Sequence, residues 1–520
     1  MPTPADDTRV RLAELLAALS LGVDLGFNQP MEHVLRQSLI ALRISDLLGL
    51  ADDERFVVYH TSLLVNVACH SDAHEQAKWF GDDIAVKATK YTHGLHGVKS
   101  AVGSLKFMGG VGRPMMERFR IGLQFAAWGH KEVDQMVQHH SRLARAFAEE
   151  LGLPTEVAEA VDGSYEQWDG KGWPGDLKGE DVPLASRITQ VAEFVEAAFR
   201  AGGLDAAIGI ARKQAGKQFD PKLADMVVTN PEDILGGLDE INTWSVVIDG
   251  EPSLSIPLTE DEFDQALTAI ANFVDLKSPY TLGHSAAVAE LAAAAAAQLD
   301  MSADEQRLLR RSGLVIGFGR LGVSNAIWDK PGPLGTGEWE RIRLHPYFTQ
   351  RMLSQSPKLA ELSAIAVQYR ERLDGSGYPG GLRAGAISRP ARVLAASDAY
   401  RSMREPRPYR ESLTDEEAAT ELRSEVTAGR LDGDAVDAVL AVAGHRVPRR
   451  RDAAAGLTTR EVEVLRLVAR GLTNKAIAQQ LVISPKTAGN HVEHIYTKIG
   501  ASNRAAASLF AMQHGLLHDG

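Results

Sequence analysis

Six residues of metal-binding type recur in two sets along the chain. The first set is His33, His140 and Glu193, and the second is His284, His345 and Asp398. Two histidines and one carboxylate that converge would make an iron or zinc site. A water bound to such a metal can lose its proton near neutral pH and act as a nucleophile. These residue types therefore raise the hypothesis of metal-assisted hydrolysis.

The two sets belong to an internal duplication. The segment DGKGWPGDLKG begins at Asp169 and matches DGSGYPGGLRAG, which begins 205 residues later at Asp374. The same offset relates the second histidine and the carboxylate of each set, but the first histidines, His33 and His284, are 251 residues apart. The first copy should therefore carry an insertion of 46 residues, which we place at about 80–130.

The elements that must position these residues are helices. Apolar residues recur at intervals of three and four, and no alternating run is long enough for a strand. The predicted fold class is all-α, with two helical bundle domains followed by a four-helix domain. The predicted boundaries are 1–235 for the first copy, 236–257 for a linker, 258–445 for the second copy, 446–455 for an arginine-rich linker and 456–520 for the last domain.

The second copy resembles the HD-GYP family, helical phosphohydrolases that open cyclic di-GMP on a two- or three-metal centre. The resemblance rests on GHS at 283–285, KPGPL followed by His345, ERLDGSGYPGGL from Glu371, ARVLAASDAY around Asp398 and RPYR from Arg407. The first copy resembles the family more weakly, with Trp173 in place of the tyrosine of GYP. The resemblance implies metal ligands from an early His, a His-Asp pair, a lone His, a His-His pair and a late Asp.

Both ligand pairs are missing from both copies. The positions of the His-Asp pair hold Ile316-Gly317 and Val65-Asn66, and those of the His-His pair hold Tyr369-Arg370 and Ser164-Tyr165. We therefore expect no catalytic residues and no cofactor, and we expect the six remaining residues to be hydrogen-bonded relics inside the bundles. The alternative is a working metal-dependent cyclic dinucleotide phosphodiesterase with a DNA-binding appendage.

Arginines stand at or beside the former ligand positions of the second copy. Arg320, Arg370, Arg372 and Arg392, together with Tyr378, are candidates for a pocket that binds a cyclic nucleotide or another anionic small molecule. The alternative is that these are ordinary surface or salt-bridged arginines.

The last 65 residues carry the start and stop signals of four short helices. Thr458 and Glu461 form a capping box, Thr473 and Ser484-Pro485 begin the second and third helices, and Gly471 suits a helix end. The third helix has an apolar face of Ala488, Val492, Ile495 and Ile499, and its polar face has types that contact phosphates and base edges. An ordinary amphipathic surface helix would have the same spacing.

This segment resembles the LuxR-type helix-turn-helix, with LTTRE, GLTNKAIA, SPKT, NH and KIG followed by NR. The resemblance implies binding to double-stranded DNA and dimerisation through a fourth helix at 503–512. The candidate DNA contacts are Asn474, Ser484, Lys486, Thr487, Asn490, Glu493, His494, Lys498 and Arg504. One departure is Ala488-Gly489, where the family usually has valine and a basic or polar residue.

Charge and composition agree with this division. From residue 446 onward 11 Lys and Arg face 5 Asp and Glu, whereas the net charge of the whole chain is −12. The acidic body should therefore repel phosphate while the basic tail attracts it. One cysteine, no signal-like start and no apolar run long enough to span a bilayer favour a cytoplasmic protein that does not enter a membrane. The sequence predicts a homodimeric transcriptional regulator whose inactive body serves sensing or dimerisation.

Overall fold

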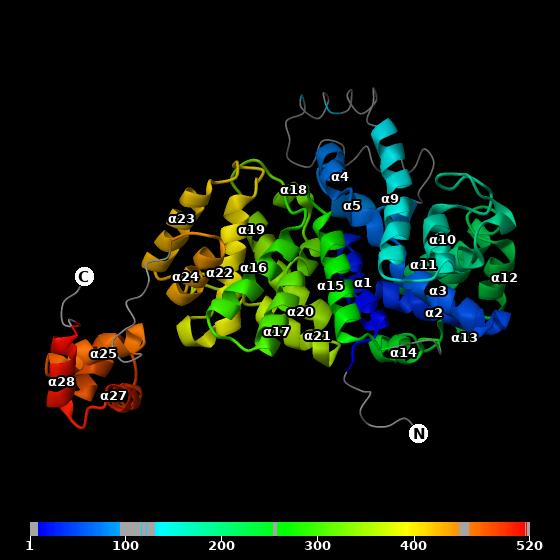
Figure 1. The fold of residues 1–520 in the computed structure, drawn as a ribbon. Coiled ribbons are helices and arrows are strands. Elements are labelled where there is room, and N and C mark those ends of the chain that lie inside the picture. Colours follow the sequence, from blue (N-terminus) through cyan, green and yellow to red (C-terminus); the bar gives the residue numbers. More distant parts are fainter. Residues whose placement is uncertain are drawn as a thin grey trace, which may run out of the picture. The chain divides into compact units, whose positions relative to one another are not determined.

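The computed structural model describes residues 9–93, 116, 121, 130–252, 257–446, 457–514 and 516, and every regular element among them is a helix (Figure 1). This confirms the all-α prediction. The chain divides into two compact units, Met1–His445 and Arg446–Gly520. The three arginines at 449–451 and much of the predicted insertion lie outside the described residues. None of the described helices is both long and apolar enough to cross a membrane.

The first copy is built from helices of which α2, α3 and α11 pack against one another. They are α1 (Leu12–Gly26), α2 (His33–Leu48), α3 (Asp52–Leu64), η1 (Val67–His70), α4 (Ala73–Phe80), α5 (Asp83–Ala88), α6 (Lys90–His93), α9 (His130–Glu150), α10 (Thr155–Asp162), η3 (Gly163–Tyr165), η4 (Gly179–Asp181), α11 (Leu184–Gln214), α12 (Pro221–Thr229) and α13 (Pro231–Leu235).

The predicted linker at 236–257 contains a packed helix, α14 (Thr243–Asp249). Val247 and Ile248 are buried, and Tyr59 of α3 donates a hydrogen bond of 3.1 Å to the Val247 carbonyl. The turn residues on either side suggested a linker, but the apolar side chains between them bury surface against the first copy. This segment therefore belongs to the core.

The second copy repeats the arrangement around α16 and α22. Its helices are α15 (Glu260–Asp275), α16 (His284–Gln298), α17 (Ala303–Leu314), η5 (Phe318–Gly322), α18 (Asn325–Trp328), α19 (Thr336–Arg343), α20 (His345–Leu353), α21 (Pro357–Ala366), η6 (Ala384–Ala386), α22 (Arg389–Arg404), α23 (Asp415–Thr427) and α24 (Gly433–Val442).

The duplication is visible in matching hydrogen bonds. Asp24 accepts a bond of 3.1 Å from the Val34 amide, and Asp275 accepts one of 2.7 Å from the Ser285 amide, at the offset of 251. In each copy this buried carboxylate fixes the start of the helix that carries the early histidine. The same backbone geometry therefore presents His33 and His284.

A second matching pair holds the loop after the repeated glycine motif. Glu166 accepts hydrogen bonds from the amides of residues 175–177, and Glu371 accepts them from the Gly380 and Leu382 amides. Both loops need a glycine, because a Cβ at Gly172 or Gly377 would lie 2.3 Å from a backbone nitrogen. The GYP motif thus has a backbone role that both copies keep.

The two copies share one core. The rings of Phe147 in α9 and Phe273 in α15 stack with centroids 4.0 Å apart. A Cβ at Gly22 in α1 would lie 2.5 Å from Met352 Cε in α20, so the two helices pack closely there. In Figure 1, α1 lies between the other helices of its own copy and α15 of the second copy.

The C-terminal unit has four helices: α25 (Thr459–Ala469), α26 (Asn474–Leu481), α27 (Pro485–Ile499) and α28 (Arg504–Gln513). Each predicted capping signal is confirmed: Thr458, Thr473 and Ser484 each accept a hydrogen bond from an amide of the following turn, and Gly471 has φ +86°. Ala488, Val492 and Ile495 are buried in the core of this unit, as the apolar stripe predicts.

Substitution by alanine of Gly489, inside α27, and of Gly500, directly after it, should change the free energy of unfolding in opposite directions. A Cβ at Gly489 would meet Asn474 Nδ2 at 3.6 Å, an ordinary contact, so Gly489→Ala should raise the free energy of unfolding by about 1 kcal/mol. Gly500 ends the helix with φ +66°, so Gly500→Ala should lower it by about 1 kcal/mol. Urea denaturation of a fragment spanning 446–520 measures both changes, and equal signs would contradict this account.

Candidate functional site

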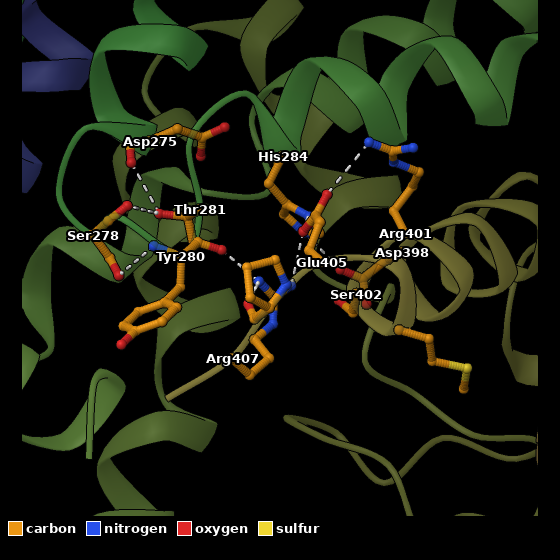
Figure 2. A network of polar contacts seen from close by, with 12 residues as sticks. Asp275, Ser278, Tyr280, Thr281, His284, Asp398, Arg401, Ser402, Glu405 and Arg407 are labelled. Carbon is orange, nitrogen blue, oxygen red and sulfur yellow. Dashed lines mark hydrogen bonds and ion pairs between the residues drawn. The ribbon is translucent and has the colours of Figure 1, made fainter. Parts of the chain in front are cut away.

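The early histidine of the second copy lies between two carboxylates. His284 begins α16 and is fully buried. Its Nε2 is 3.2 Å from Asp398 Oδ1, and its Nδ1 is 2.8 Å from Glu405 Oε2 (Figure 2). Glu405 is held in turn by Arg407, whose Nη2 donates a bond of 3.0 Å. His284 is thus bound on both sides by carboxylates of the chain.

Asp398 takes its balancing charge from arginine. Arg370 Nη2 lies 3.3 Å from Asp398 Oδ2. Burial favours the neutral acid, but the positive charges of Arg370, His284 and Arg320 outweigh it, so the pKa of Asp398 lies below its ordinary value. The carboxylate therefore stays ionised inside the bundle.

The lone histidine of the second copy is occupied on both sides of its ring. His345 Nδ1 lies 2.5 Å from the Ile342 carbonyl oxygen, and Nε2 lies 2.6 Å from the Tyr369 hydroxyl. Burial and the nearby charges of Arg320 and Arg370 hold the pKa of His345 well below its ordinary range. A neutral ring that donates from Nδ1 and accepts at Nε2 satisfies both contacts.

The first copy carries a lysine at its centre. Lys90 Nζ lies 2.6 Å from Glu193 Oε1 and 2.7 Å from Asn66 Oδ1. Asn66 Nδ2 and the Tyr91 hydroxyl donate to the same Glu193 oxygen at 2.7 and 3.0 Å. His33 pairs with Glu196 instead of Glu193. The ammonium group therefore neutralises the late carboxylate of this copy.

His140, the remaining member of the first set, pairs with Asp72, the residue directly before α4. The six histidines and carboxylates of the two sets thus do not gather into one site. Among the residues that the structure describes, no three His, Cys, Asp or Glu side chains are placed to hold a metal ion. Ile316 and Gly317 supply no ligand, and the side chains present do not fit the two- or three-metal centre that the family resemblance implies.

A cavity of about 460 Å³ opens beside this cluster in the second copy. Its cationic lining residues are Lys277, Arg320, Lys330, Arg370, Arg407 and Arg410, and its aromatic ones are Tyr280, Trp328, Trp339, Tyr378 and Tyr409. The Arg320 side chain is buried, and its Nε and Nη1 have no hydrogen-bond partner among the described residues. Its guanidinium carbon lies 5.5 Å from the centre of the Trp328 ring.

Two of the five predicted pocket residues do not line this cavity. Arg372 donates a bond of 2.8 Å to the Glu371 carbonyl, and Arg392 binds Asp432 Oδ2 at 3.1 Å and the Ala384 and Ile387 carbonyls. Arg372 thus braces the backbone before the GYP motif, and Arg392 braces the loop that follows it. Lys277 and Arg407 line the cavity but were not among the predicted pocket residues, although Arg407 belongs to the RPYR motif.

The candidate DNA contacts lie mostly on the outside of the C-terminal unit. Lys486, Asn490, Glu493 and His494 are exposed along α27, and Asn474 is exposed at the start of α26. Ser484 and Thr487 are also exposed and bind each other through their hydroxyl groups at 2.8 Å. Arg504, at the start of α28, is half-buried.

Lys498 is exposed as well, but its ammonium group pairs with a carboxylate of another helix. Its Nζ lies 2.8 Å from Glu461 Oε2, the carboxylate that also closes the capping box of α25. The lysine therefore ties α27 to α25.

Comparison with known proteins connects both units to families. The HD domain family matches residues 130–223 and 268–435, and the luxR family of bacterial regulatory proteins matches 455–511. The 3′3′-cGAMP-specific phosphodiesterase 3 of Vibrio cholerae is 31% identical over 407 residues, which are 77% of this chain and 88% of that protein. The cyclic di-GMP phosphodiesterase response regulator RpfG of Xanthomonas campestris is 30% identical over 184 residues, which are 35% of this chain and 48% of that protein.

A solved structure also resembles the fold of this chain. The crystal structure of a cyclic GMP-AMP specific phosphodiesterase of V. cholerae has a TM-score of 0.57 and 27% identity, and the match covers 85% of this chain and 99% of that one.

These relatives correct one prediction. We expected no cofactor because the ligand pairs are missing, but the body matches phosphodiesterases over most of its length, and a metal centre is what the HD-GYP resemblance implies for that reaction. The expectation of no cofactor is therefore wrong. It relied on the four missing ligand pairs and gave too little weight to the similarity of the whole body to metal-dependent enzymes. The chain belongs to the HD domain family and carries a C-terminal domain of the luxR family of bacterial regulatory proteins.

Proposed function

We propose that this protein is a DNA-binding transcriptional regulator whose body binds a cyclic dinucleotide in the arginine-lined cavity of its second copy. The observation that carries the proposal is the buried Arg320, with two guanidinium nitrogens that lack a partner in the described part of the chain. An unpaired buried donor is costly, and more so when it is charged. A phosphate oxygen in the cavity would satisfy it.

The rest of the cavity lining suits the same class of ligand. Arg407 and Lys277 add positive charge, and guanidinium groups bind phosphates through paired hydrogen bonds. Trp339 is about half exposed and Tyr409 still more so, which leaves ring faces free to stack on bases. The volume of about 460 Å³ is in the range of small-molecule sites.

Dimerisation of the C-terminal unit is part of the proposal. Leu509 and Met512 are exposed on α28, where two apolar side chains can pack against a second copy. The polar face of α27 offers Lys486, Asn490, Glu493 and Thr497 to a groove, with His494 exposed beside them, and Gly489 adds no side chain. Specific binding therefore needs two half-sites about one helical turn apart.

Substitution of Arg320 should weaken ligand binding. Arg320→Met keeps a long apolar side chain but removes the donors, so we expect the Kd for 3′3′-cGAMP or cyclic di-GMP to rise at least about tenfold, as for loss of a charged hydrogen bond. Isothermal titration calorimetry measures this. Arg310→Met is the matched control, because Arg310 lies outside the cavity and pairs with Glu290. Absence of heat with both dinucleotides and the wild-type protein would overturn the proposal.

Substitution of the apolar face of α28 should abolish specific DNA binding. Leu509→Glu places a charge in the proposed dimer contact, so the footprint on a natural operator should disappear while non-specific binding at low salt persists. Gln479→Glu, on an exposed position of α26 away from the proposed dimer contact, is the control for charge alone. A wild-type footprint that covers a single half-site with full affinity is the contrary result.

A second candidate function is cleavage of the dinucleotide, which the likeness to the V. cholerae phosphodiesterase over 77% of the chain favours. In this case the purified protein, supplied with Mn²⁺ or Fe²⁺, should convert 3′3′-cGAMP or cyclic di-GMP to a linear product. Chromatography of the nucleotides measures this. Turnover that is lost in His284→Ala or Asp398→Ala would replace binding by hydrolysis as the role of the body.

A further inference from the structure

Two segments of the second copy that line the cavity are held by the first copy. One is residues 277–280, after α15, and the other is residues 324–329, around α18. Both contact α4 and α5, which precede them by about 200 residues or more in the sequence and belong to the first copy. The polar contacts between these parts are buried or half-buried.

Asp83 of α5 connects the two segments. Its Oδ1 accepts bonds of 2.7 Å from the Ser324 hydroxyl and 2.9 Å from the Asn325 amide, and its Oδ2 is 3.5 Å from Lys277 Nζ. The side chain is fully buried. Burial favours the neutral acid, but Lys277, Lys87 and the two hydrogen bonds lower the pKa of Asp83 to about 2. An ionised carboxylate of one copy therefore holds both cavity segments of the other.

His74 of α4 makes a second connection at the same wall. Its Nδ1 lies 2.8 Å from Asp329 Oδ2. Asp329 Oδ1 accepts a bond of 2.6 Å from the Ser278 hydroxyl, and Oδ2 accepts one of 2.7 Å from Asn325 Nδ2. The His74 imidazole thus holds the Asp329 carboxylate, which joins residues 277–280 to residues 324–329 on the cavity side.

We infer that His74 and Asp83 of the first copy are positioning residues for the ligand cavity of the second copy. This inference rests on the proposed function for the identity of the ligand, a cyclic dinucleotide. Among the described residues, the first copy contributes no side chain to the cavity lining, but it sets where Lys277, Ser278 and Asp329 stand. Ligand affinity therefore depends on the contact between the copies.

The test compares His74→Leu with His74→Gln in the full chain. Leucine removes the bond to Asp329, whereas glutamine keeps an N–H donor. We expect His74→Leu to raise the Kd of 3′3′-cGAMP or cyclic di-GMP about tenfold and His74→Gln to restore it to within about threefold of the wild type. An unchanged Kd in the leucine variant, or failure of glutamine to restore affinity, would overturn the inference.

A second measurement needs no ligand. Amide hydrogen exchange of residues 277–281 and 324–329 should become faster in His74→Leu and return to the wild-type rate in His74→Gln. Equal amide exchange rates in the wild type and both His74 variants would contradict the inference. If neither dinucleotide binds the wild type, the proposed function fails, and the exchange result alone decides whether the first copy positions this wall.

Met352→Ala is the matched control for loss of contact between the copies. Met352 is buried against Gly22 of α1 and does not line the cavity. This variant should lower the Tm but leave the Kd and the exchange of the two segments unchanged. A rise in Kd as large as that of His74→Leu would mean that general destabilisation, and not the His74 contact, controls affinity.

Discussion

In both copies a buried carboxylate requires a positively charged side chain beside it, and this requirement determines which residues occupy the centre of each bundle. Glu193 and Asp398 lie at matching positions of the repeat and are almost fully inaccessible to water. An isolated charge in such a place costs several kcal/mol, so a cation must stand beside it. The two copies supply different cations from their own side chains: an ammonium group from Lys90 in the first and a guanidinium group from Arg370 in the second.

This difference separates the two copies chemically. In the first copy, Lys90 donates hydrogen bonds to Glu193 and Asn66. Its ammonium nitrogen also lies 5.6 to 5.8 Å from four aromatic ring centres, those of Phe27, Tyr91, Tyr165 and Phe194. The charge of Lys90 is therefore balanced by groups of its own copy. In the second, Arg370 and His284 both face Asp398, and Arg320 adds a positive charge with two nitrogens that have no hydrogen-bond partner in the described part of the chain. An excess of positive charge beside an open cavity is what makes the second copy the proposed binding site.

The sequence predicted those features that depend on local signals or on repetition. Capping residues act within four positions, which is why Thr458, Thr473 and Ser484 were found correctly. The repeated motif located the paired loops, although the packed helix in the predicted linker was missed. The roles of Lys90 and Asp83 could not be predicted, because their partners lie 103 and about 194 to 242 positions away in the sequence. Only the tertiary fold brings such charges together.

The contact between the copies also bears on how the gene could have changed after its duplication. The first copy alone would leave the Phe147 ring without Phe273 and the Asp83 carboxylate without Lys277. The second copy alone would lack the carboxylate that holds Ser324 and Asn325. A recombination event that separated the two copies would therefore expose an aromatic ring of each half to water and leave buried polar groups without their partners, at a cost in stability.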